Sequence, residues 1–119
     1  MDPDKLGTKA ISILSDSENR VLVSVISFWE ISLKVSIGKF SIKGLDLKKL
    51  PDLTLKTGIE IISLTEEEAT GYAQLPYIKN HRDPFDRMII WQAICNKFTI
   101  VSKDAEFKQY RSQGLKTIW

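Results

Sequence analysis

The chain has little of several features that define particular protein classes. A single cysteine, Cys95, excludes a disulfide framework or a cysteine-based metal site within one chain, and makes a reducing cytosol the natural compartment. No apolar run approaches the length of a membrane span, and we expect no secretory signal and no membrane partner. Internal repeats and low-complexity segments are also missing. These absences predict a cytoplasmic globular protein with a single domain over residues 1–119.

An excess of charge of one sign is missing as well. The chain carries 17 Lys and Arg side chains against 15 Asp and Glu, a net charge of +2. Such a mild excess permits a nucleic-acid partner without arguing for one. The hydrophobic share of 43% is ordinary for a globular domain, so function has to be sought in particular residues.

The stretch 81–104 combines a helix start, an apolar helix and a buried strand. Asp83 can cap the helix, and Pro84 fits the first helical position. The helix has little polar face, so we expect it to be largely buried, with Cys95 in the core. The following segment, 98–102, is β-branched and apolar without alternation, which is typical of a strand covered on both faces.

Helical patterns separate four predicted strands, at 21–25, 59–64, 98–102 and 115–119. Strands that alternate with helices predict an α/β fold, in which a parallel sheet carries helices on both faces. Ser27 and Glu30 match a capping box, so a helix is expected to begin there, directly after the first of these strands. Trp29 and Trp91 lie on apolar helical faces and are expected in the core.

Acidic residues are expected to meet at one edge of this sheet. Glu30 and Asp86 lie in first turns of helices, and Asp104 follows a strand. In an open parallel sheet, the carboxyl ends of strands and the starts of the following helices share one edge. Crowded carboxylates repel, and Mg²⁺ or Mn²⁺ with oxygen ligands removes that conflict. Because such an ion activates water and stabilises charge on a phosphoryl oxygen, phosphodiester hydrolysis is the natural chemistry.

Each of these acidic residues also has a purely structural interpretation. Glu30 can be only the capping-box partner of Ser27. Asp86 can favour the dipole of its helix, and Asp104 can cap the turn that follows it. For Asp83 the cap is favoured over a ligand role, because a proline follows. On spacing alone, both interpretations stay open.

The remaining polar side chains near these positions favour ordinary surface. His81 and Arg82 could contact a phosphate, but a basic pair in a loop is more often simply exposed. Solvated surface is also the expectation for Glu66, Glu67 and Glu106.

Motifs along the chain, taken in order, resemble those of a PIN domain. They are W-E-I-S at 29–32, H-R-D-P-F-D-R at 81–87 and S-K-D at 102–104. The chain resembles the PIN domains that are toxins of type II toxin–antitoxin modules (VapC-like), and the resemblance extends to the closing strand, L-K-T-I-W. The resemblance implies an α/β, three-layer sandwich with a central, mainly parallel sheet.

The resemblance also implies a function. It implies a Mg²⁺- or Mn²⁺-dependent endoribonuclease that hydrolyses RNA phosphodiester bonds as the toxin of a toxin–antitoxin pair. Carried over by motif, the catalytic and metal-binding residues are Glu30, Asp86 and Asp104, with Asp83 as a weaker metal ligand. Ser102 stands where the family often has threonine and would orient this edge by hydrogen bonding. The implied partners are RNA, a cognate antitoxin and a second copy of the chain.

One feature of the family is not found. PIN domains open with a central strand that carries an aspartate, of the type L-L-D-T-H, whereas M-D-P-D-K-L-G matches the helical start that normally comes later. Asp2 and Asp4 suit a helix cap and do not replace that aspartate. We therefore expect a PIN-like domain that is incomplete at its N-terminus. The strands at 21–25 and 98–102 would either pair with each other or accept a strand from another chain, giving a strand-swapped homodimer. The alternative function is a non-catalytic remnant that acts only by binding an antitoxin or itself.

Overall fold

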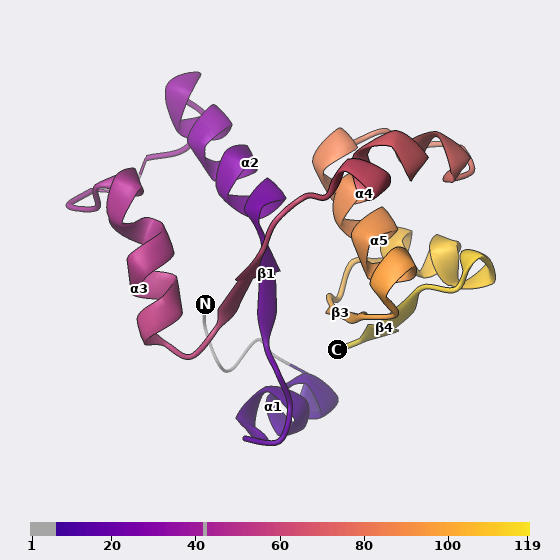
Figure 1. Cartoon of the computed structure of the whole chain (residues 1–119), viewed down its shortest axis with the longest axis horizontal. Coiled ribbons are helices and arrows are strands. Elements are labelled where there is room, and N and C mark those ends of the chain that lie inside the picture. Colours follow the sequence, from indigo (N-terminus) through magenta and orange to yellow (C-terminus); the bar gives the residue numbers. More distant parts are fainter. Residues whose placement is uncertain (1–6, 42) are drawn as a thin grey trace. The chain divides into compact units, whose positions relative to one another are not determined.

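The computed structural model describes residues 7–41 and 43–119 (Figure 1). The chain divides into two compact units, one formed by residues 1–19 with 65–119 and the other by Arg20–Leu64. That residues 1–119 form one domain stays a prediction. The predicted caps at Asp2 and Asp4 lie outside the described residues.

Helices and strands alternate along the chain, as the sequence predicts. The unit Arg20–Leu64 contains β1 (Leu22–Ser24), α2 (Val25–Ser36), the 3-10 helix η2 (Leu47–Lys49), α3 (Leu50–Lys56) and β2 (Glu60–Ile62). The other unit contains α1 (Thr8–Ser15), α4 (Glu66–Gly71), η3 (Tyr72–Gln74), α5 (Pro84–Asn96), β3 (Thr99–Val101), η4 (Ala105–Gln113) and β4 (Lys116–Ile118), of which η3 and η4 are 3-10 helices. In the part of the chain that is described, none of these helices is both long enough and apolar enough to cross a membrane.

In each unit two strands pair in parallel. β1 pairs with β2, with Leu22 opposite Glu60, and β3 pairs with β4, with Thr99 opposite Lys116. Among the described residues, each unit thus contains a two-stranded parallel sheet. Within each unit a strand pairs with the next strand along the chain, brought beside it by the intervening helices. That strand 21–25 pairs with strand 98–102, one of the two predicted alternatives, stays a prediction.

The core of the unit that contains α5 is apolar and gathers around that helix. Its buried members are Leu75, Ile90, Ala93, Phe107, Tyr110 and Leu115. Trp91 packs against this cluster, as predicted. The prediction that Cys95 is buried is wrong, because it lies two residues after Ala93 and hence on the opposite side of a helix with 3.6 residues per turn.

In the unit Arg20–Leu64, α2 begins earlier than the sequence predicts. The chain passes directly from β1 into the helix, and the Ser24 hydroxyl caps it by accepting a hydrogen bond from the Ile26 N–H at 3.1 Å. The predicted capping box of Ser27 with Glu30 is therefore wrong, because both residues lie inside the helix. Trp29, predicted to be buried, is 60% exposed.

The capping box at the start of α4 also ties this helix to α5. The Thr65 hydroxyl accepts from the Glu68 N–H at 3.0 Å, and Glu68 Oε1 accepts from the Thr65 N–H at 2.9 Å. The same carboxylate accepts hydrogen bonds from Gln92 and Asn96 on α5, at 3.2 and 2.7 Å. Burial by itself raises the pKa of Glu68, but the hydrogen bonds from Thr65, Gln92 and Asn96 outweigh it, so the pKa is lowered overall.

Glu68→Gln is expected to lower the free energy of unfolding at neutral pH by about 1–3 kcal/mol, because an amide nitrogen replaces one of the two accepting oxygens. The pKa of Glu68 is lower in the folded state. Its stabilisation is therefore fully present above the ordinary glutamate pKa of about 4.3 and is lost as the pH falls below it. Urea unfolding of both proteins at neutral and acidic pH measures this: the difference should shrink in acid. The matched control is Glu67→Gln, at an exposed neighbour. A loss of the same size there would contradict the stabilising role of the hydrogen bonds to Glu68.

Candidate functional site

The turn before α5 fixes the start of that helix. Asp83 is the N-cap, and its Oδ1 accepts hydrogen bonds from the N–H groups of Phe85 at 2.9 Å and Asp86 at 3.3 Å. Pro84 occupies the first helical position, where its missing N–H costs nothing. The predicted cap is confirmed, and it sets the direction in which Asp86 leaves the first turn of α5.

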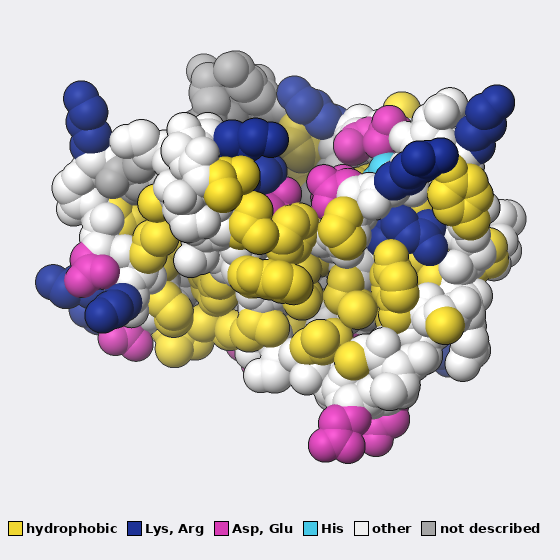
Figure 2. All heavy atoms as spheres, turned by 90° about the horizontal axis from the view of Figure 1, so that it is seen from above, with side chains coloured by type: hydrophobic (Ala, Val, Ile, Leu, Met, Phe, Trp, Pro, Cys, Tyr) yellow, Lys and Arg dark blue, Asp and Glu magenta, His cyan; other side chains and the backbone are white. Residues whose placement is uncertain are grey.

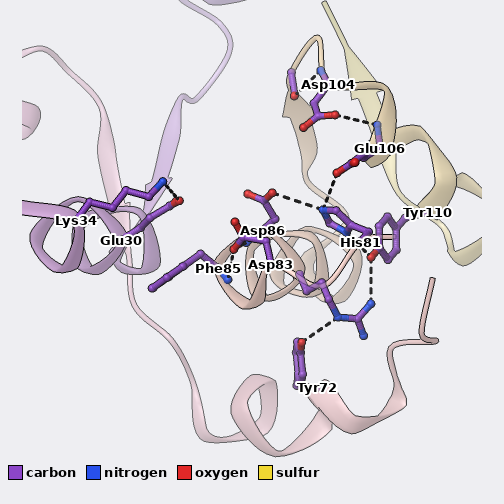
Figure 3. A network of polar contacts seen from close by, with 12 residues as sticks. Glu30, Lys34, Tyr72, His81, Asp83, Phe85, Asp86, Asp104, Glu106 and Tyr110 are labelled. Carbon is purple, nitrogen blue, oxygen red and sulfur yellow. Dashed lines mark hydrogen bonds and ion pairs between the residues drawn. The ribbon is translucent and has the colours of Figure 1, made fainter. Parts of the chain in front are cut away.

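Asp86 lies beside a buried histidine. His81 Nε2 is 3.5 Å from Asp86 Oδ2 and 3.7 Å from Glu106 Oε2, so one nitrogen faces two carboxylates (Figure 3). The His81 side chain is only 2% exposed, so the prediction of an exposed basic pair is wrong for it, whereas Arg82 is exposed as expected. Glu106 is half exposed but faces this nitrogen, which sequence reasoning missed.

The two nitrogens of His81 have different surroundings. Nδ1 lies 2.6 Å from the Tyr110 hydroxyl, whereas Nε2 is buried and has no hydrogen-bond partner among the described residues. Buried polar atoms without a partner are rare in native proteins. Both carboxylate oxygens near Nε2 lie at or beyond the outer limit of a good hydrogen bond. This nitrogen therefore marks a polar position that the fold leaves incompletely satisfied.

Arg87 donates to the tyrosine that contacts this histidine. It is buried, 8% exposed, and its Nη1 donates to the Tyr110 hydroxyl at 3.0 Å. Its Nε donates to the Tyr72 hydroxyl at 2.9 Å. The same guanidinium also donates to the backbone carbonyls of Leu75 and Pro76, each at 3.1 Å. Arg87 thus connects η3 and the loop after it, through Tyr110 on η4, to His81.

Asp104 lies at the junction of β3 and η4. Its Oδ1 accepts from the Glu106 N–H at 2.9 Å, so the local interpretation of Asp104 as a cap is seen in the structure. Its own N–H donates to the Ser102 hydroxyl at 3.0 Å. Ser102 therefore orders this turn by hydrogen bonding, as predicted, and the cap places Glu106 in the first turn of η4.

Glu30 belongs to the unit Arg20–Leu64 and lies in the second turn of α2, not in the predicted first turn. Its Oε2 accepts from Lys34 Nζ at 2.7 Å, an ion pair one helical turn apart. The side chain is 21% exposed. A cation bound by Glu30 would share this carboxylate with Lys34 or compete with it.

The carboxylate oxygens of these residues are of the type that binds a hard divalent cation, but in the described part of the structure they are not grouped around one position. Asp and Glu oxygens are the ligands that Mg²⁺ and Mn²⁺ prefer. Over the described ranges, 7–41 and 43–119, no three or more His, Cys, Asp and Glu side chains are grouped to hold a metal ion. Asp86 and Glu106 face His81, and Asp104 faces the start of η4.

Comparison with known proteins decides the family. The model of the PIN domain family matches residues 1–112. The chain belongs to the PIN domain family. No curated protein sequence matches this PIN domain. Among solved structures it is similar to a chain of VapBC2 from Rickettsia felis bound to a DNA fragment from their promoter, with a TM-score of 0.62 and 24% identity. The likeness covers 92% of this PIN domain and 81% of that chain, and at this identity it shows the fold. The predicted α/β, PIN-like fold is thus confirmed.

Proposed function

We propose that this PIN domain is a metal-dependent endoribonuclease that hydrolyses RNA phosphodiester bonds with Mg²⁺ or Mn²⁺. The observation that carries the proposal is the capped start of α5, where Asp86 faces a buried histidine together with Glu106. Membership of the PIN family supports the reaction class.

In this proposal Glu30, Asp86 and Asp104 hold the ion, with Asp83 as a weaker ligand. When bound, Mg²⁺ or Mn²⁺ lowers the pKa of a bound water and stabilises charge on a phosphoryl oxygen. The chain supplies the orientation: the Asp83 cap fixes the first turn that carries Asp86, and Ser102 fixes the turn that carries Asp104. Asp83 already accepts two backbone hydrogen bonds through one oxygen, which supports its secondary role.

The proposed biological role is the toxin of a toxin–antitoxin pair in the cytoplasm. The similar solved structure is of VapBC2 with promoter DNA, and this supports a cognate antitoxin as the partner. A homodimer, in strand-swapped form, is proposed as well: within its own unit each described strand has one neighbour, and a strand edge is a site where a strand of a second copy can pair.

The first test is a thermal shift with Mn²⁺ on the wild-type chain and on Asp104→Asn. Asparagine caps a helix as well as aspartate does, so this change removes the charge and keeps the cap. Mn²⁺ is expected to raise the Tm of the wild type, because an ion at about 100 times its dissociation constant stabilises a folded protein by about 2.7 kcal/mol. In Asp104→Asn the rise should vanish.

The matched control for this test is Asp52→Asn, which removes an exposed carboxylate from the first turn of α3 and should keep the full rise. Cleavage of a mixed RNA pool, with and without Mn²⁺, then tests the activity itself. The proposed nuclease activity would be ruled out if Mn²⁺ does not change the Tm of the wild type and the RNA pool stays intact.

The second candidate is a non-catalytic PIN domain that acts only by protein–protein binding. Its support is an apolar hollow in the unit Arg20–Leu64, lined by Phe28, Trp29, Ser32, Leu47, Lys48, Leu50 and Pro51. Hydrophobic side chains are also widely exposed on the face seen in Figure 2. Stable self-association or antitoxin binding, without Mn²⁺ binding, would favour this candidate over the nuclease.

A further inference from the structure

We propose that His81 is a positioning residue that holds the carboxylates of Asp86 and Glu106. In this arrangement Tyr110 fixes the neutral imidazole as the tautomer with its proton on Nε2, and that N–H is directed between the two carboxylates. The arrangement itself depends only on the fold, whereas its consequence for metal binding rests on the proposed function.

The bond from Arg87 favours a Tyr110 hydroxyl that donates to His81. A guanidinium can only donate, so Arg87 Nη1, at 3.0 Å, occupies a lone pair of the Tyr110 oxygen. The hydroxyl proton is then available to His81 Nδ1, which lies 2.6 Å away, a short distance typical of a strong bond. Because Nδ1 accepts this proton, the proton of the neutral imidazole ring is on Nε2.

Two carboxylate oxygens lie near the Nε2–H group. Asp86 Oδ2 and Glu106 Oε2 lie 3.5 and 3.7 Å from it, on α5 and η4 respectively. A donor shared between two carboxylates reduces their repulsion, and it is the kind of partner that orients carboxylate ligands in metal sites. In Figure 2 the single histidine is seen only as a small cyan area beside acidic side chains, in keeping with its burial.

The ring cannot easily turn away from this position. It packs edge-on against Phe107 and Tyr110, with ring centroids 6.0 and 5.3 Å away. The His81 N–H donates to the Ile78 carbonyl at 3.1 Å, in a tight turn where Asn80 has φ of 71°, a conformation that asparagine tolerates well. The backbone, the packing and the Tyr110 bond therefore agree on one orientation of the imidazole.

Nitrogen NMR of the imidazole tests the tautomer without any metal or RNA. The chain has one histidine, so its ring signals are assigned without further variants. At mildly alkaline pH, where an ordinary imidazole is neutral, the wild type should show a protonated Nε2 and an unprotonated Nδ1. Tyr110→Phe should give a mixture of tautomers. Tyr72→Phe is the matched control, since it removes a hydroxyl from the same arginine without touching His81, and should keep the wild-type pattern. A protonated Nδ1 in the wild type, or an unchanged pattern in Tyr110→Phe, would overturn the proposal.

Mn²⁺ titration tests the consequence. His81→Leu should weaken Mn²⁺ binding by about 10-fold or more, the usual loss when the partner of a ligand is removed. His81→Gln, whose amide nitrogen can reach the position of Nε2, should recover part of that loss. If the wild type binds no Mn²⁺, the proposed function fails and the NMR result still decides the positioning of the imidazole. If the wild type binds Mn²⁺ and a folded His81→Leu binds it equally well, the positioning role is wrong.

Discussion

Asp86→Asn is expected to reduce RNA cleavage by about 100-fold or more, which corresponds to about 2.7 kcal/mol of lost transition-state stabilisation. Among the proposed ligands, Asp86 is the one whose backbone is held by the Asp83 cap and whose carboxylate lies beside His81. We therefore expect the loss of its charge to have a large effect. Asparagine keeps the shape of the side chain but is a much poorer ligand for Mg²⁺ or Mn²⁺. The helix itself should lose no more than about 1 kcal/mol from the weaker interaction with its dipole.

The comparison variant is Asp83→Asn. It keeps the cap and removes the same charge one turn earlier, so a loss of cleavage well below 10-fold is expected there. Initial cleavage rates at saturating Mn²⁺, with the Tm of each variant as a check on folding, separate the two. Equal losses at Asp83 and Asp86 would contradict the assignment of Asp83 as mainly a cap, and full activity in Asp86→Asn would contradict the proposed site.

Local signals in the sequence were sufficient wherever a structural feature depends on neighbouring residues. The cap at Asp83 and the proline after it depend only on adjacent residues, and both are confirmed. The S-x-x-E pattern failed at Ser27, because Ser24 stands at the end of β1 and caps the helix first. A capping pattern therefore predicts a helix start only when no better cap precedes it.

The histidine site needed information that the sequence does not carry locally. His81 can be buried because the Tyr110 hydroxyl, 29 residues later, is the hydrogen-bond partner of Nδ1, and Arg87 in turn donates to that hydroxyl. Glu106 faces the same ring because Asp104 caps η4 and thereby places Glu106 in the first turn of that helix. A histidine and an arginine six residues apart, around a D-P cap, were visible in H-R-D-P-F-D-R, but only the long-range partner decides their burial.

Arg87→Met is expected to lower the free energy of unfolding by about 3 kcal/mol or more. Arg87 donates to four acceptors, the hydroxyls of Tyr72 and Tyr110 and the carbonyls of Leu75 and Pro76. Methionine fills a similar volume but leaves these groups without their donor, and each lost hydrogen bond to a charged group costs about 1.5–3 kcal/mol, not additively.

Urea unfolding measures this loss against a matched control. Arg82→Met removes an exposed arginine that donates to the Tyr77 hydroxyl at 2.9 Å and stacks on its ring, and should change the stability by no more than about 0.5 kcal/mol. Arg87→Lys keeps the charge but loses the planar fork, so its loss should fall between those of the two methionine variants. Because Arg87 also orients Tyr110, any folded Arg87→Lys protein should show the mixed His81 tautomers of Tyr110→Phe, which links the stability of this core to the geometry of the site. If Arg87→Met is no less stable than Arg82→Met, the four hydrogen bonds of Arg87 do not stabilise the fold as predicted.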